Sequence, residues 1–176
     1  TAPGTDMSLA EDKIKGMKHF ANKLWNIARF ILMNVDASTI GLKDGDTLSP
    51  EDIAMQKGLA EVIEKTTKDI ETFMIHQAAQ TIYNSLWYDF ADKYIEYSKT
   101  ALNGNDETDM RIKQTILYES LLTYLKLLHP FMPFVTEHIW SLPGFKGKLI
   151  VGEWPEMEVG NVPEDFERLR LLVTDM

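Results

Sequence analysis

The chain has 176 residues, of which 44% are hydrophobic, and its 27 acidic and 18 basic residues give a formal net charge of −9 at pH 7. It contains no cysteine, which excludes a disulfide framework, a thiolate nucleophile and a cysteine-ligated zinc site. No apolar run approaches the roughly 18 residues that a membrane-spanning helix needs. The first residues, TAPGTDMSLAED, lack the features of a signal peptide, so we expect a cytoplasmic protein without a membrane partner.

The first predicted element is a long helix from about Leu9 to about Asn34. Ser8 and Glu11 have the spacing of a capping box, in which each side chain accepts a hydrogen bond from the backbone N–H of the other residue. Within this helix, the stretch 13–35 contains no acidic residue and five basic ones: Lys13, Lys15, Lys18, Lys23 and Arg29. Positive charge concentrated on one element of an acidic chain indicates a polyanionic partner.

Two stripes of residues run along this helix. Apolar residues recur every three or four positions, at Met17, Phe20, Leu24, Ile27 and Ile31. This spacing predicts one face that enters a core. The other stripe consists of Lys18, Asn22, Trp25, Asn26 and Arg29. Asparagine is a poor helix former, so two asparagines on one face favour a binding surface, although the pattern also fits a solvated face with a partly buried tryptophan.

Three further long helices follow, with a loop between the first and the second. Ser49-Pro50-Glu51-Asp52 combines an N-cap, a proline at the first helical position and acids in the first turn. A phase shift in the apolar pattern indicates a break at 73–75, and Asn103-Gly104-Asn105 ends the next helix. The last of these helices is capped by the residues from Asp106 to Asp109. The predicted spans are 49–71, 76–102 and 109–128.

The C-terminal part is predicted to be shorter elements. Pro130 cannot continue a helix, and Pro133 suits the first turn of a short one that ends near Trp140. The run Leu149–Glu153 could pair as one short edge strand. We therefore expect an all-α fold, an antiparallel bundle of four long helices with short C-terminal helices. Residues 1–155 would form the bundle and residues 156–176 the start of a truncated segment, as expected for a fragment of a longer chain.

The sequence carries no recognisable catalytic or metal-binding constellation. It has no Gly-rich phosphate loop, no G-x-S-x-G and no H-E-x-x-H. Glu137 is adjacent to His138, so the Glu-x-x-His ligand pair of di-iron bundles is absent. Paired acids fall at helix starts, where the helix dipole explains them. We therefore expect this segment to hold no catalytic residue, no metal and no cofactor.

The remaining function class is binding. Loop RNA is recognised by stacking on aromatic rings, by amide hydrogen bonds to base edges and by cations on phosphates. The first helix offers all three kinds of group, which makes RNA rather than DNA the expected partner. The candidate RNA-binding residues are Lys15, Lys18, Asn22, Trp25, Asn26 and Arg29. Lys13 would extend this surface, and Lys146 and Lys148 form a second small cationic spot.

Four segments resemble the anticodon-binding helical domain of class I aminoacyl-tRNA synthetases, most closely that of the valyl-tRNA synthetases. They are residues 3–35, residues 86–99 (LWYDFADKYIEYSK), residues 127–140 (LLHPFMPFVTEHIW) and residues 149–155 (LIVGEWP). They occur in the family's order and at its spacing. The isoleucyl and leucyl enzymes share part of the pattern, so they remain alternatives; the runs Phe20–Asn26 and Tyr94–Lys99 favour the valyl enzymes.

The resemblance implies an ATP-dependent valine–tRNA ligase that also uses Mg²⁺, with its catalytic domain elsewhere in a longer chain. This segment would bind the anticodon stem-loop of a valine-accepting tRNA. In the family, an asparagine and an arginine of the first helix approach anticodon bases, and these correspond to Asn26 and Arg29. The LHPFMPF block, the Trp140/Trp154 pair and Tyr94, Ile95 and Tyr97 would be packing residues.

Two other classes of function stay open from the residues themselves. In a helical protein–protein module, the basic helix would dock against an acidic partner helix. In a ligand- or metal-binding enzyme bundle, stoichiometric iron or zinc would be found. The net charge of −9 opposes RNA binding at long range, so we expect an isolated fragment to bind weakly and to lose binding as salt rises.

Overall fold

The computed structural model of the chain describes residues 11–36, 39–143 and 147–156. The helices are α1 (Glu11–Asn34), α2 (Pro50–Glu71), α3 (Ile75–Asn84), the π-helical η1 (Ser85–Ile95), α4 (Glu96–Leu102), α5 (Glu107–Leu128), α6 (Pro133–Ser141) and the short 3₁₀ helix η2 (Leu149–Val151). The described part contains no strand, which confirms the all-α class. The expected edge strand at 149–153 is wrong, because 149–151 forms a 3₁₀ turn instead.

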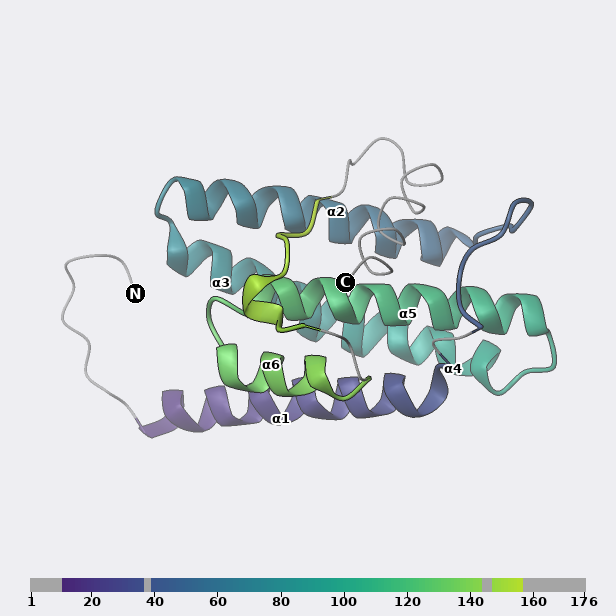
Figure 1. The fold of residues 1–176 in the computed structure, drawn as a ribbon, viewed down its shortest axis with the longest axis horizontal. Coiled ribbons are helices and arrows are strands. Elements are labelled where there is room, and N and C mark those ends of the chain that lie inside the picture. The colour runs from purple at the N-terminus through teal and green to yellow at the C-terminus, as the bar shows by residue number, and fades with distance from the viewer. Residues whose placement is uncertain (1–10, 37–38, 144–146, 157–176) are drawn as a thin grey trace.

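The helices lie side by side around α5 (Figure 1). This helix contacts α1, α2, α3, α4 and α6, and its side chains are buried almost without interruption from Ile112 to Leu128. A helix that is covered on all sides needs apolar or internally bonded side chains around its whole circumference. α3, η1 and α4 follow one another without a gap and form the long helix that the sequence predicted at 76–102.

The helix starts follow the predicted caps. The Ser49 hydroxyl accepts a hydrogen bond from Asp52 N at 3.1 Å, and the Asp52 carboxylate accepts one from Ser49 N at 3.0 Å. At the start of α5, the Asp106 carboxylate accepts from Thr108 N and Asp109 N. The predicted capping box of Ser8 lies outside the described residues, as do residues 157–176 of the predicted truncated segment.

The turn between α2 and α3 confirms the predicted break, although no glycine marks it. Phe73 N donates to Ile70 O at 3.0 Å and Met74 N donates to Asp69 O at 2.7 Å, the two bonds of a Schellman motif. This motif needs a left-handed backbone at its C′ position, where glycine is preferred. Here the C′ residue is Phe73, with φ of 59°.

The core contains most of the residues that periodicity and the family resemblance predicted, with three corrections. Phe20, Leu24, Ile27 and Ile31 of α1 are buried, but Met17 is 58% exposed because it lies near the helix end, beyond the packed part of α1. Tyr97 is 40% exposed, since it lies at the rim of a groove rather than in the core. Phe134, in the expected packing block, is 92% exposed.

A buried polar network joins three helices inside the bundle. The Lys113 ammonium of α5 lies 2.6 Å from an Asp52 carboxylate oxygen, and the Tyr94 hydroxyl of η1 donates to the other oxygen at 2.6 Å. Burial opposes ionisation of Asp52, but the hydrogen bonds from Lys113 and Tyr94 outweigh it and lower its pKa. The network therefore holds an ionised pair between α2 and α5.

Candidate nucleic-acid interface

The predicted polar stripe of α1 lies on the surface of the molecule. Lys18, Asn22, Asn26 and Arg29 are all exposed. Among the residues that the structure describes, no hydrogen bond or ion pair holds any of these four side chains. Lys15 extends the same stripe and is also exposed. We call these residues, together with Trp25, the α1 face.

The opposite side of α1 explains this exposure. Leu24, Ala28 and Ile31 are fully buried, and α1 packs on α5 and α6. An α-helix places residues three and four apart on one side, so the buried residues fix the α1 face toward the surrounding solvent. The sequence prediction of two opposed stripes is correct for this part of the helix.

The sequence left open whether Trp25 is a base-stacking ring or a partly buried packing residue. The indole is half-buried, and it stacks on the imidazole of His138 from α6, with ring centroids 5.4 Å apart and planes 5° apart. One face of the ring is therefore covered within the chain. Trp25 is also packed against the hydrophobic core, so it joins α1 to α6 at the centre of the α1 face.

A groove of about 320 Å³ opens beside Trp25 and Arg29. Its lining comes from α1, from α5 and from the end of α6: Trp25, Arg29, Leu32, Met33, Val35, Tyr118, Leu142 and Pro143. Burial raises the pKa of Tyr118 to about 12, so this phenol is neutral at pH 7. The groove is mainly apolar, and Arg29 is the one charged residue in its lining. Sequence reasoning missed the residues from α5 and α6 because no periodicity links them to α1.

Lys23 does not belong to this surface. Its ammonium forms an ion pair with Asp92 of η1 at 2.7 Å and lies 3.8 Å from the centroid of a Trp87 ring. One cation of the acid-free stretch therefore connects α1 to η1 within the chain. The side chain of Lys13 and the residue Lys146 lie outside what the structure describes, whereas Lys148 is exposed.

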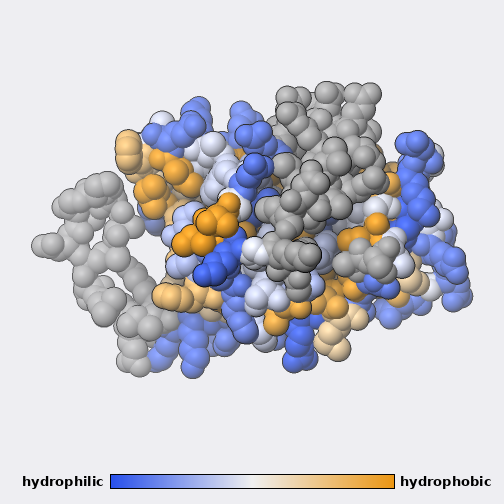
Figure 2. Space-filling view, viewed as in Figure 1, coloured by the Kyte–Doolittle hydropathy of each residue, from blue (hydrophilic) through white to orange (hydrophobic). Residues whose placement is uncertain are grey.

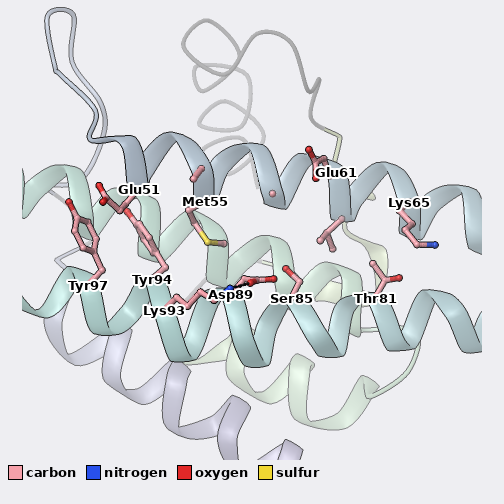
Figure 3. A pocket seen from close by; sticks show the side chains of 13 residues that line it. Glu51, Met55, Glu61, Lys65, Thr81, Ser85, Asp89, Lys93, Tyr94 and Tyr97 are labelled. Atoms are coloured by element: carbon pink, nitrogen blue, oxygen red, sulfur yellow. Dashed lines mark hydrogen bonds and ion pairs between the residues drawn. The ribbon is translucent and has the colours of Figure 1, made fainter.

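A second groove runs between α2 and the α3–η1 helix (Figure 3). Its volume is about 590 Å³, and its walls carry the exposed acids Glu51, Glu61 and Asp89. The two lysines of this groove form ion pairs, Lys93 with Asp89 and Lys65 with Asp69, each at 2.7 Å. Because its cations are neutralised and its free charges are negative, this groove does not suit a polyanion.

Within the described ranges, no three His, Asp or Glu side chains gather as a metal site would require. The His129 ring Nδ1 lies 2.9 Å from the Thr136 hydroxyl, so this ring bonds a side chain of α6. The described helices also include none that is long and apolar enough to cross a membrane.

The model of a protein family described as "Anticodon-binding domain of tRNA ligase" matches residues 52–175. This match begins after α1, but similar curated proteins align across nearly the whole chain. The valine–tRNA ligase of Syntrophotalea carbinolica is 40% identical over 168 residues, which are 93% of this chain and 19% of that protein. That of Clostridium tetani is 36% identical over 169 residues, 95% of this chain and 19% of that protein.

A solved structure is similar in fold. In the ternary complex of Agrobacterium radiobacter K84 agnB2 LeuRS with tRNA and LeuAMS, the matching chain has a TM-score of 0.61 and 22% identity, over 93% of this chain and 18% of that one. At this identity the likeness concerns the fold alone. The chain spans about a fifth of the length of the curated relatives named above.

Proposed function

Because this chain belongs to the family of anticodon-binding domains of tRNA ligases, we propose that it is the anticodon-binding domain of a valine–tRNA ligase and that the α1 face contacts the anticodon stem-loop. One observation carries this proposal: four exposed polar side chains follow one another along α1, and none of them forms a hydrogen bond or ion pair with a described residue. In a folded protein, polar groups arranged in this way are available to a partner.

Each member of the α1 face has a chemically suitable role. Lys15 and Lys18 would lie along phosphates, which position an RNA but do not identify its sequence. The amides of Asn22 and Asn26 can both donate to and accept from base edges. Arg29 presents a planar set of donors to a base or a phosphate. This division fits a loop whose bases are unstacked.

The groove beside Arg29 would receive an unstacked base. Its lining is mainly apolar and includes one charged residue, Arg29. An apolar slot with a few polar groups is a common form of ligand site. Trp25 would form one wall of this slot, held in place by His138. Its role would be to position the base and Arg29 rather than to offer both faces for stacking.

The wider assignments are part of the same proposal. Valine is favoured over leucine or isoleucine because the curated relatives named above are valine–tRNA ligases at 36–40% identity. ATP and Mg²⁺ would be used by the catalytic domain of the longer chain, which would be a partner of this one. The protein would act in the cytoplasm, with tRNA as its nucleic-acid partner and no role for DNA.

The test compares variants of the full-length protein in binding to valine-accepting tRNA and to the same tRNA with an altered anticodon, over a salt series. Arg29→Ala and Asn26→Ala should each weaken binding of the cognate tRNA by about 1–3 kcal/mol and reduce discrimination between the two tRNAs. Lys18→Ala should weaken the binding of both tRNAs equally, because it removes one phosphate contact. For the same reason, the slope of log affinity against log salt concentration should become shallower by about 0.7–1.

Lys57→Ala is the matched control. Lys57 is exposed on α2, away from the α1 face. Like Lys18→Ala, this variant removes one positive charge. It should leave both affinities within about twofold, because exposed charges are screened beyond a Debye length of about 8 Å. Unchanged affinity in Arg29→Ala and Asn26→Ala, with unchanged helicity, would refute the assignment of the α1 face.

A further inference from the structure

The groove between α2 and the α3–η1 helix, which we call the second groove, lies outside the proposed anticodon contact. Its lining is mainly apolar, and α2 supplies Ala54, Met55, Gly58 and Val62 to it. Figure 2 shows hydrophilic side chains projecting from α2 at the upper edge of the molecule, so this helix has a solvated side as well as the side that lines the groove. The volume of about 590 Å³ is within the range of small-ligand sites.

The opposite wall of the second groove is a row of residues four positions apart: Thr81, Ser85, Asp89, Lys93 and Tyr97 (Figure 3). In an α-helix, residues four apart turn away from one another by about 40° at each step. Three members of the row belong to the π-helical η1, whose i→i+5 hydrogen bonds widen the turn and reduce this drift. The π-helix therefore keeps one line of side chains along the groove, and π-helical turns are frequent at functional sites.

Gly58 keeps the floor of the second groove open. It lies inside α2, where glycine is less favourable than alanine. A Cβ at this position would meet no atom within 4 Å in the part of the chain that the structure describes, so no close neighbour there requires a glycine. Glycine also allows a ligand to approach the backbone closely, which fits its place in the lining.

The free charges of the second groove are two carboxylates. Glu51 and Glu61 are exposed, and no hydrogen bond or ion pair joins either of them to a described residue. The two lysines of the lining are each paired with an aspartate. Glu51 and Glu61 lie ten residues apart on α2, which is about 15 Å along the helix axis. Figure 3 shows Glu51 beside Tyr97 toward one end of the groove and Glu61 toward the other.

We propose that the second groove binds a linear aliphatic polyamine, with its methylene chain on the apolar floor and its ammonium groups at Glu51 and Glu61. An extended chain covers about 3.5 Å for every three bonds, so a tetraamine such as spermine is long enough to reach both carboxylates. A polyanion would be repelled, and a compact metal cation would gain nothing from the apolar floor. This inference goes beyond the anticodon contact and does not depend on it.

The test is calorimetric titration of the full-length protein, free of tRNA, with spermine. Glu51→Gln and Glu61→Gln should each weaken spermine binding about two- to fivefold, the effect of losing one exposed ion pair. Glu64→Gln is the matched control, because Glu64 is also exposed on α2 but does not line the groove. It makes the same change in charge and should leave the affinity for spermine unchanged.

Gly58→Leu tests the groove itself. Leucine is a better helix former than glycine, and its Cβ would meet no described atom within 4 Å, so circular dichroism should show unchanged helicity. The leucine side chain would occupy the floor of the groove. Spermine binding should therefore be lost, while tRNA affinity, measured without spermine, should be unchanged.

Several results would overturn the proposal. One is the absence of spermine binding to the unmodified protein. Equal losses in Glu61→Gln and Glu64→Gln would show a general attraction between a polycation and an acidic chain, and unchanged affinity in Gly58→Leu would place spermine elsewhere. Crosslinks from p-benzoyl-phenylalanine at position 54 to another protein surface would identify a protein as the occupant. Because tRNA affinity is measured on the same variants, a failure of the anticodon proposal would be seen separately.

Discussion

At the residue scale, Phe73 occupies a helix-end position whose backbone conformation favours glycine. The backbone around it forms both hydrogen bonds of a Schellman motif, so the turn itself is complete. Only the Cβ and the ring are unfavourable, because a left-handed conformation brings Cβ close to the neighbouring carbonyl oxygen. The residue therefore lowers the stability of the fold at a position where glycine would not.

Phe73→Gly should raise the free energy of unfolding by about 1 kcal/mol, because the left-handed strain is of this size. Thermal or urea denaturation at pH 7 measures the change. Phe73→Ala is the control, since it removes the ring but keeps Cβ and so keeps the strain. It should not gain stability. A loss of stability in Phe73→Gly would mean that the ring makes a stabilising contact within the chain.

At the element scale, α6 supports α1 through the stacked pair of His138 and Trp25. The rings are nearly parallel at a centroid distance of 5.4 Å, within the range of favourable aromatic pairs. The helix α6 is only nine residues long, so it has little stability of its own. Its contact with Trp25 connects the α1 face and the groove beside Arg29 to the rest of the fold.

His138→Ala should lower the free energy of unfolding by about 1 kcal/mol, the size of one aromatic pair. It should also weaken tRNA binding a few-fold, because Trp25 would no longer be held against α6. His138→Phe keeps a ring at this position and should restore both properties. If His138→Ala lowers stability but leaves tRNA affinity unchanged, the wall formed by Trp25 has no part in binding.

The elements themselves were largely predictable, because helix formation leaves local signals. Ser49 and Asp106 mark helix starts by their side-chain chemistry, and the α1 face follows from periodicity within one helix. The π-helical segment Ser85–Ile95 could not be predicted, since it preserves an apolar pattern close to that of an α-helix. The run at 149–153 has the composition of a strand, but no neighbouring strand exists in the described part to pair with it.

The candidate site was predictable only where one helix supplies it. Lys18, Asn22, Asn26 and Arg29 share a side of α1, and their exposure follows from the burial of Leu24 and Ile31 on the other side. Tyr118 and Leu142 join the groove through the packing of α5 and α6 on α1, which sequence spacing does not encode. The exposure of Phe134 was missed for the same reason, because an apolar residue next to a buried helix is usually expected to be buried.

At the scale of the whole molecule, the buried Asp52–Lys113 pair connects two of the long helices. It lies between α2 and α5, and Tyr94 brings η1 into the same network. Lys113 also lies 3.0 Å from a carboxylate oxygen of Asp109. Although burial opposes its charge, these carboxylates raise the pKa of Lys113. Breaking one member would leave a buried charge without compensation, which costs more than the intact pair contributes.

Lys113→Met should lower the free energy of unfolding at pH 7 by about 3–5 kcal/mol. Asp52 has a lowered pKa in the folded protein, so its contribution is present above the ordinary value of 3.8 and is lost as the pH falls through the folded value. In the variant, the unpaired Asp52 carboxylate can take up a proton in acid and become neutral. The difference in the free energy of unfolding between the variant and the unmodified protein should therefore narrow as the pH falls toward 4. Urea denaturation over pH 4–8 measures both effects.

Lys57→Met provides the comparison, because Lys57 is exposed on α2. It should change the free energy of unfolding by no more than about 0.5 kcal/mol, with no dependence on pH in this range. If the loss of unfolding free energy in Lys113→Met stays constant from pH 8 to pH 4, lost packing rather than the unpaired Asp52 carboxylate causes the destabilisation.

In the proposed function, four side chains of the α1 face also affect how long a bound tRNA stays. Lys18, Asn22, Asn26 and Arg29 have no described partner to fix their rotamers, so each must lose rotamer freedom on contact, at about 0.5–1.5 kcal/mol per side chain. This cost reduces affinity mainly by speeding dissociation. The proposed valine–tRNA ligase would have to release each charged tRNA before it accepts the next one, and a short residence time on this face would suit that cycle.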